Sequence, residues 1–169
     1  MMIHALSVLD GILAISPLPG GGGDFLGDMA HVTEWRPAMV ITLVTRAEME
    51  AAGAALLGVH VQDHGSRWLH LPIPDFGTPP QEMRRLWPEV SAQARQALSG
   101  GGRVLVHCRG GCGRSGMVAL RLMIEAGEAP DEALARLRHV RPCAVETDAQ
   151  MGWAMEAPRR AALFLRHMD

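Results

Sequence analysis

The chain has 169 residues, a formal net charge of −2 and a hydrophobic content of 48%. This length and composition predict one soluble globular domain over residues 1–169, without the overall positive field that attracts nucleic acid or an acidic membrane surface. Residues 1–16 are apolar but include Asp10 and no basic stretch, so we expect no leader peptide, no membrane span and a cytoplasmic location.

Strands and helices alternate along most of the sequence. In chain order, the pattern predicts strands at 3–8 and 12–15, a helix from Asp24 toward Trp35, a strand at 38–44, a helix within 46–53, a strand at 68–71, a helix over 80–98, a strand at 103–107, and helices over 116–126, 130–139 and from Thr147 onward. Such alternation predicts an α/β fold in which helices flank a central, mainly parallel sheet.

Several residues mark where these helices begin, bend and end. Asp24, Thr45 and Thr147 are N-cap residues, and Pro88 is expected to bend or split the helix that contains it. Pro158 is expected to interrupt the last helix. The segment 116–126 is apolar on nearly every side, so this helix should pass through the middle of the domain.

The segment HCRGGCGRSG, residues 107–116, places a cysteine and several glycines between a strand and a helix. Glycines at this density let the backbone curl so that several N–H groups face an anion. Cys108 follows the strand, and the amino terminus of the next helix favours both a bound anion and the thiolate form of the cysteine. A thiolate is a strong nucleophile near neutral pH.

Two residues that follow the glycines complete this candidate site. The planar guanidinium of Arg114 can hold two oxygens of a phosphate group at once. The hydroxyl of Ser115 can reach back to the Cys108 sulfur and help it leave when a phosphocysteine is hydrolysed. His107 is expected to hold the loop through hydrogen bonds.

Residues 108–115 resemble the Cys-x5-Arg-Ser/Thr signature loop of the protein tyrosine phosphatase superfamily, including the histidine before the cysteine. The compact size and the flanking segments are similar to the dual-specificity group, nearest its kinase-associated (cyclin-dependent-kinase-inhibitor-3-like) branch. The resemblance implies that fold, a phosphate, sulfate or vanadate ion bound in the loop, and no metal or organic cofactor. It implies that the substrate phosphate contacts Arg109, Gly110, Gly111, Cys112, Gly113 and Arg114.

The same resemblance implies a general acid on a separate loop. The stretch LPIPDFGTP at 71–79 supplies Asp75, which is similar to the superfamily's acid, and its prolines and glycine suit a loop that closes over substrate. A turn aspartate that only caps local backbone is the other reading of Asp75. Asp63, in a polar turn, and Asp148, as the first residue of a helix, are weaker candidates for the acid.

A third segment, RPCAVETDAQ at 141–150, resembles the RPGAIET-x-x-Q stretch of kinase-associated and related phosphatases. The resemblance implies that Gln150 positions the water that attacks phosphocysteine, although the residue equally suits an exposed helix surface. Cys143 stands where that stretch has glycine. A cysteine at this position suggests a redox role for Cys143.

The three cysteines do not form a disulfide framework, and their odd number suits a reducing compartment. Cys112 is interpreted either as a small apolar filler of the loop or as the partner of Cys108 in a protective disulfide under oxidation. The cysteine spacing and His107 match none of the usual zinc-finger spacings, so we expect no metal site.

These residues predict a cysteine-dependent phosphatase that acts on a phosphorylated protein or a small phosphate monoester, with phosphotyrosine the expected group and phosphoserine or phosphothreonine also possible. One alternative is a phosphatase for a small-molecule or lipid phosphate such as an inositol phosphate. The resemblance disfavours it, because superfamily members that act on lipids or polyphosphates usually have lysines in the loop and this chain has none. The other is a catalytically weak phospho-binding partner protein, which the intact Cys108, Arg114 and Asp75 disfavour. The missing lysine also argues against a P-loop nucleotide site.

Overall fold

A five-stranded sheet in the order β1-β2-β5-β3-β4 forms the centre of the computed structural model, which describes residues 1–158. The strands are β1 (His4–Val8), β2 (Gly11–Ser16), β3 (Met39–Thr42), β4 (Arg67–His70) and β5 (Arg103–His107). β1 and β2 pair antiparallel, and the pairs β2–β5, β5–β3 and β3–β4 are parallel. The predicted α/β architecture with a mainly parallel sheet is confirmed.

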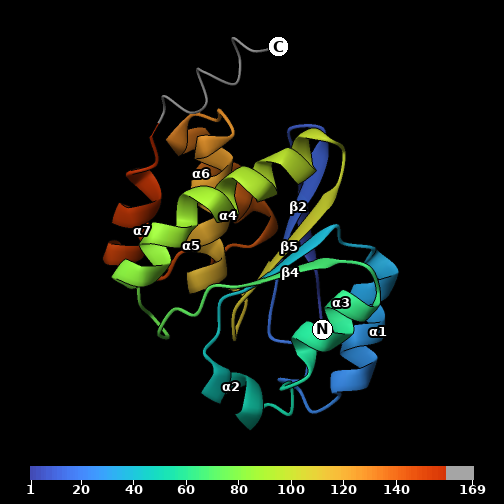
Figure 1. Ribbon diagram of the computed structural model, residues 1–169. Coiled ribbons are helices and arrows are strands. Elements are labelled where there is room, and N and C mark those ends of the chain that lie inside the picture. Colours follow the sequence, from blue (N-terminus) through green and yellow to red (C-terminus); the bar gives the residue numbers. More distant parts are fainter. Residues whose placement is uncertain (159–169) are drawn as a thin grey trace.

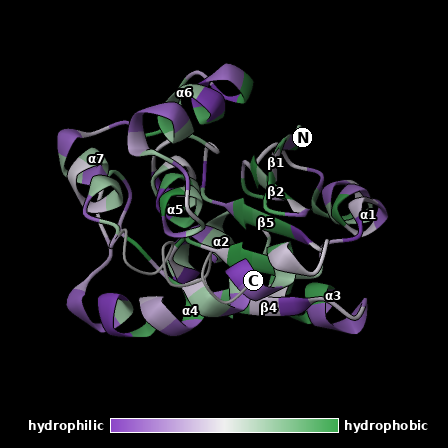
Figure 2. Cartoon of the chain, turned by 90° about the horizontal axis from the view of Figure 1, so that it is seen from above, coloured by the Kyte–Doolittle hydropathy of each residue, from purple (hydrophilic) through white to green (hydrophobic). Residues whose placement is uncertain are grey.

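Helices cover both faces of the sheet (Figure 1). They are α1 (Phe25–Trp35), α2 (Arg46–Ala51), α3 (Leu57–Asp63), α4 (Gln81–Ser99), α5 (Gly113–Glu125), α6 (Pro130–Val140) and α7 (Asp148–Met155). The view in Figure 2 shows α1 and α3 on one side of the sheet and α4, α5, α6 and α7 on the other. Among residues 1–158, no helix is both long and apolar enough to cross a bilayer.

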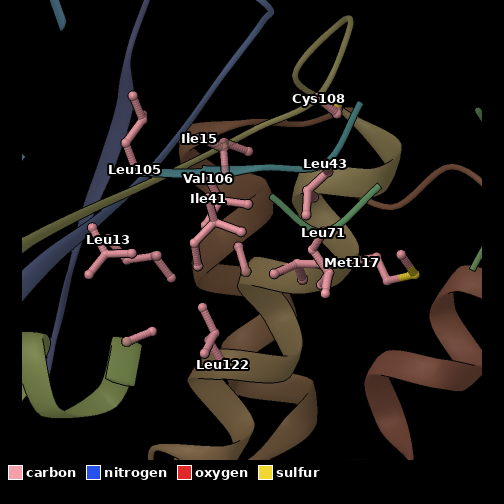
Figure 3. Close-up of a cluster of buried hydrophobic side chains, with 14 of the residues drawn as sticks. Leu13, Ile15, Ile41, Leu43, Leu71, Leu105, Val106, Cys108, Met117 and Leu122 are labelled. Carbon is pink, nitrogen blue, oxygen red and sulfur yellow. The ribbon is translucent and has the colours of Figure 1, made fainter. Parts of the chain in front are cut away.

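Helix α5 fills the space behind the sheet, as its apolar sequence predicts. Every residue from Gly113 to Glu125 except Arg121 is buried. Figure 3 shows side chains of β2, β3 and β5 gathered with those of α5, and Cys108 lies at the end of this cluster. Strand β5, which ends just before Cys108, and the helix that follows the loop are therefore both part of the main core.

Three of the capping predictions are confirmed, and two of the caps involve residues that also reach the site. The Asp24 side chain accepts a hydrogen bond from the Gly27 N–H at the start of α1. Thr45 and Glu48 form a capping box at α2, and Thr147 and Gln150 form one at α7. These two boxes fix the first turns from which Glu48 and Gln150 extend.

The structure differs from the sequence prediction at three helices. Helix α3 was not predicted, because its seven residues include Gly58 and are too few to show a clear period, and Asp63 ends this helix instead of lying in a polar turn. Helix α4 is not split at Pro88 but continues through it, with Trp87 and Val90 beside it buried in the core, and the alternative of a bend stays a prediction. Helix α7 ends at Met155, before Pro158, and residues 159–169 lie outside the described part of the chain.

Gly58 tests how closely α3 packs on the sheet, and Gly152 in α7 serves as the control. A Cβ on Gly58 would lie 2.6 Å from ring atoms of Trp68, whereas a Cβ on Gly152 in α7 would meet nothing within 4 Å. We expect Gly58→Ala to lower the free energy of unfolding by about 1–3 kcal/mol through overpacking. Gly152→Ala should raise it by about 0.5–1 kcal/mol, since alanine is the better helix former. Urea unfolding followed by circular dichroism measures both, and stabilisation of both variants would contradict the packing.

Candidate active site

The signature loop leaves the carboxyl end of β5 and enters α5. Cys108 is only 3% exposed. Among residues 1–158, it is the cysteine that forms no disulfide. Its Sγ lies 3.2 Å from the Ser115 Oγ. The structure therefore brings together the predicted nucleophile, Cys108, and the hydroxyl of Ser115 that is predicted to stabilise the leaving sulfur.

Carbonyl groups of the loop are bonded to its surroundings. Arg109 O accepts from the Leu18 N–H at 3.0 Å, and the Arg141 guanidinium donates to Gly110 O and Gly111 O, both at 3.0 Å. In a trans peptide the N–H points away from the C=O of the same unit. Holding these carbonyls outward therefore turns the N–H groups of the next residues toward the opposite side, where an anion would be bound.

Two glycines of the loop lie where it packs closely against other parts of the chain. Gly111 has φ +74°, and a Cβ there would lie 2.8 Å from the Pro17 backbone nitrogen. A Cβ on Gly113 would lie 2.4 Å from Glu146 Oε1 and 3.0 Å from Gln150 Oε1. The loop therefore packs against the end of β2 on one side and against the 146–150 segment on the other.

Arg114 is fully buried at the first turn of α5 and is 1% exposed. Its two terminal nitrogens each lie 2.8 Å from one carboxylate oxygen of Glu48, and Nη1 also donates to Ile73 O at 2.9 Å. Asp75 Oδ1 lies 3.2 Å from Nη2. A bidentate pair of this kind fixes the plane of the guanidinium.

The charges at this pair shift both pKa values in the directions expected of a salt bridge. The hydrogen bonds from Arg114 lower the pKa of Glu48 to about 2, against the opposing effect of burial. Burial acts to lower the pKa of Arg114, but the hydrogen bond and charge of Glu48, with the charges of Cys108 and Asp75, raise it overall. Glu48 is thus an anion and Arg114 a cation throughout the physiological range. A role for Glu48 in the site was not predicted, because its capping-box position signals only the start of a helix.

Asp75 lies in a tight turn after β4. Gly77 N–H donates to Pro74 O at 2.8 Å, and Phe76 N–H donates to Asp75 Oδ1 at 3.0 Å. Phe76 has φ +60°, a left-handed conformation that costs a bulky residue energy, and its side chain is 61% exposed. Asp75, rather than Asp63 or Asp148, is the aspartate against Arg114.

Gln150 connects α7 to this acid-bearing turn. Its Oε1 accepts from the N–H groups of Glu146 and Thr147 at 3.0 and 3.2 Å, and its Nε2 donates to Gly77 O at 3.2 Å. The side chain is fully buried, so its interpretation as an exposed helix residue was wrong. Backbone groups use both ends of its amide, and a role in positioning water stays a prediction.

His107 holds the base of the loop, as predicted, through a chain of hydrogen bonds across the sheet. Trp68 Nε1–H donates to Thr42 Oγ1 at 2.8 Å, and Thr42 Oγ1 lies 2.7 Å from His107 Nε2. His107 Nδ1 lies 3.4 Å from Cys108 O, which can only accept, so Nδ1 carries the proton and Nε2 accepts from Thr42. Burial lowers the pKa of His107 to about 4, so the ring is neutral near pH 7.

The cysteine pairing differs from both interpretations of Cys112. Cys112 and Cys143 form a disulfide, with Cα atoms 5.3 Å apart, so Cys112 is neither an apolar filler nor the partner of Cys108. Packing of the 141–146 segment against the loop brings the two residues together across a separation of 31 positions, which no local pattern could show.

A cavity of about 830 Å³ opens beside the loop. Arg109 and Gly110 line it together with Glu48, Leu18, Asp24 and Asp28. Arg109 is exposed and supplies a positive charge at this wall. Within residues 1–158, no group of three or more histidine, cysteine, aspartate or glutamate side chains is placed to hold a metal ion.

The sequence is similar to one family of known proteins. Residues 28–160 match the dual specificity phosphatase catalytic domain. Cyclin-dependent kinase inhibitor 3 of Rattus norvegicus is 32% identical over 133 residues, which cover 77% of this chain and 61% of the relative. The Mus musculus protein of that name is 32% identical over 132 residues, with the same coverage. The chain therefore spans about three fifths of the length of these curated relatives.

Solved structures share the whole fold. A kinase associated phosphatase in which the catalytic-site cysteine is replaced by serine superposes with a TM-score of 0.82 and 25% identity, covering 96% of both chains. The active form of Tk-PTP superposes with a TM-score of 0.74 and 32% identity, covering 95% of this chain and 99% of that one.

The neutral His107 predicts a loss of stability in mild acid. The unfolded chain takes up a proton as the pH falls below 6.5, whereas the folded ring resists protonation until about pH 4. Stability should therefore decline from pH 7 to pH 5, by about 2 kcal/mol from this residue. His107→Gln keeps an acceptor near Thr42 but does not titrate, so it should flatten the decline, while His31→Gln, at an exposed position, should not. Urea unfolding at both pH values measures the slopes, and equal slopes in all three proteins would contradict the assignment.

Proposed function

The chain belongs to the dual specificity phosphatase family, and on that premise we propose that it hydrolyses phosphate monoesters through a phosphocysteine formed on Cys108. The observation that carries the proposal is the convergence of three groups from two distant parts of the chain, the signature loop and the turn at Asp75. Cys108 adjoins Ser115, and Arg114 contacts Asp75 from the acid-bearing turn. A nucleophile, an oxyanion-binding cation and an acid are the parts that this chemistry requires.

In the first step the Cys108 thiolate attacks phosphorus and the bond to the leaving oxygen breaks. Arg114 and the loop N–H groups hold the other phosphate oxygens, whose charge they neutralise. The incoming phosphate replaces the Asp75 carboxyl on the guanidinium, from which it is 3.2 Å away in the structure. Released from the guanidinium, the Asp75 carboxylate takes up a proton from water and donates it to the leaving oxygen as the bond to phosphorus breaks.

In the second step water attacks the phosphocysteine and phosphate leaves. Asp75, now deprotonated, removes a proton from the water, and the Ser115 hydroxyl stabilises the departing sulfur, from which it lies 3.2 Å away. Gln150 supports this step by fixing the turn that carries Asp75, through its 3.2 Å bond to Gly77 O. No step needs a metal or an organic cofactor.

A phosphorylated protein is the favoured substrate class. Asp75 is 41% exposed, and the cavity of about 830 Å³ next to Arg109 leaves room for side chains that flank a phosphorylated residue. Cyclin-dependent kinase inhibitor 3, at 32% identity, and the kinase associated phosphatase, at 25% identity, both have names that refer to kinases. We propose phosphotyrosine, with phosphoserine and phosphothreonine as further substrates.

The nucleophile and the acid are tested by hydrolysis of an aryl phosphate without added metal. We expect Cys108→Ser to lose at least about 10³-fold in kcat, and Asp75→Asn to lose about 10²–10³-fold because it keeps the shape but not the proton. Asp148→Asn, at the start of α7, is the matched control and should retain activity. The loss in Asp75→Asn should shrink for leaving groups of low pKa, and unchanged activity in Cys108→Ser would overturn the mechanism.

The Arg114–Glu48 pair predicts a second kinetic effect. Glu48→Gln removes the charge that fixes the guanidinium, so we expect kcat/KM to fall about 10–100-fold and inhibition by vanadate to weaken in parallel. Glu50→Gln changes an exposed glutamate on the same helix and should leave both values near those of the wild type. Similar losses in the two variants would show that charge on α2, not the pair, matters.

Phosphopeptides and inositol phosphates separate the remaining alternatives. A protein phosphatase turns over phosphotyrosine peptides with the higher kcat/KM, whereas a small-molecule phosphatase prefers the inositol phosphates. Binding of the peptides without phosphate release would identify a phospho-binding partner protein instead.

A further inference from the structure

The disulfide between Cys112 and Cys143 joins two parts of the active site. Cys112 is the N-cap of α5 within the signature loop, and Cys143 lies in the segment between α6 and α7. Cys143 is exposed, whereas Cys112 is partly buried. An attacking thiol from solution therefore reaches the Cys143 sulfur more easily than the Cys112 sulfur.

The surroundings favour Cys112 as the sulfur that leaves with the electron pair. Arg141 Nη2 lies 3.4 Å from Cys112 Sγ, and the first turn of α5 begins at the next residue. A guanidinium and a helix amino terminus both stabilise a thiolate. A better-stabilised thiolate leaves faster in thiol–disulfide exchange.

The bridged segment also holds the catalytic loops in place. Arg141, two residues before Cys143, donates to the carbonyls of Gly110 and Gly111. Val145 N–H donates to Cys112 O at 3.2 Å, and Gln150 supports the turn of Asp75 through Gly77 O. Opening the disulfide releases the covalent connection between this segment and the loop that binds the oxyanion.

We propose that the Cys112–Cys143 disulfide is a site of thiol–disulfide exchange with dithiol reductants, and that its reduction weakens oxyanion binding in the signature loop. A reductant thiolate attacks Cys143 Sγ, the Cys112–Cys143 bond breaks, and the electron pair leaves on Cys112. The second thiol of the reductant then displaces the Cys143 sulfur, which takes up a proton. The protein gains two electrons, held as a Cys112 thiolate and a Cys143 thiol, and the reductant becomes a disulfide.

The effect on binding follows from the charge that reduction creates. A Cys112 thiolate attracts Arg141, which otherwise donates to the Gly110 and Gly111 carbonyls, so the peptide units of the loop lose part of their fixed orientation. The new negative charge also lies beside the site that takes an anion. The effect on turnover rests on the proposed phosphatase activity, but the exchange reaction does not.

The exchange is tested in Cys108→Ser, in which Cys112 and Cys143 are the two remaining cysteines. Native protein treated with dithiothreitol should gain two alkylatable thiols without denaturant, as counted by mass spectrometry. Glutathione, a monothiol, should give a mixed disulfide that peptide mapping places on Cys143. Appearance of thiols only after unfolding, or a mixed disulfide mainly on Cys112, would overturn the proposal.

A pair of variants tests the role assigned to Arg141. Arg141→Gln should slow reduction about tenfold, and Arg141→Lys should recover part of the rate because it restores the positive charge. Arg138→Gln is the matched control, since Arg138 donates to the carbonyls of Ala144 and Val145 in the same segment. Equal slowing in Arg138→Gln would refute the electrostatic argument.

The consequence for the loop is measured by calorimetric binding of inorganic phosphate to oxidised and reduced Cys108→Ser. We expect about tenfold weaker binding in the reduced protein. Equal affinities would refute the coupling between the disulfide and the loop. Absence of phosphate binding in both states would count against the proposed function, while the thiol measurements would still decide whether exchange occurs.

Discussion

The burial of the Arg114 guanidinium is the constraint on which the site depends. A cation removed from water needs compensating charge and hydrogen bonds, and Glu48 supplies both through two contacts of 2.8 Å. This requirement places α2 beside the start of α5 and leaves Asp75 against the same guanidinium. The pair thereby joins the loop, the acid-bearing turn and helix α2 around one charge.

The loop is kept in shape largely from outside. Arg141 binds its carbonyls, and His107 ties its base to β3 through Thr42. Helix α7, which carries Gln150, is in turn held to α5 by the Arg121 guanidinium, which lies 4.3 Å from the Trp153 ring centroid and donates to Trp153 O. A loop rich in glycine has little conformational preference of its own, so this external support is what gives it one shape.

Most of the fold could be predicted from the sequence because its elements are marked locally. Apolar runs and N-cap residues such as Asp24 and Thr45 report on a few neighbouring positions, and those positions also decide where a strand or helix begins. The errors came where a local signal was weak or was outweighed. The seven residues of α3 are too few to show a period, and buried Trp87 and Val90 accompany a continuous α4 through Pro88.

The sequence by itself determined the order of the elements and the residues 108–115, with Asp75 on a separate turn, because those motifs consist of neighbouring residues. Only the tertiary structure decided that Glu48 fixes Arg114, that Arg141 orients the loop and that Cys112 pairs with Cys143. These partners lie 66, 30 and 31 positions apart. Which side chains meet over such separations depends on how the helices pack on the sheet, and no local pattern contains that information.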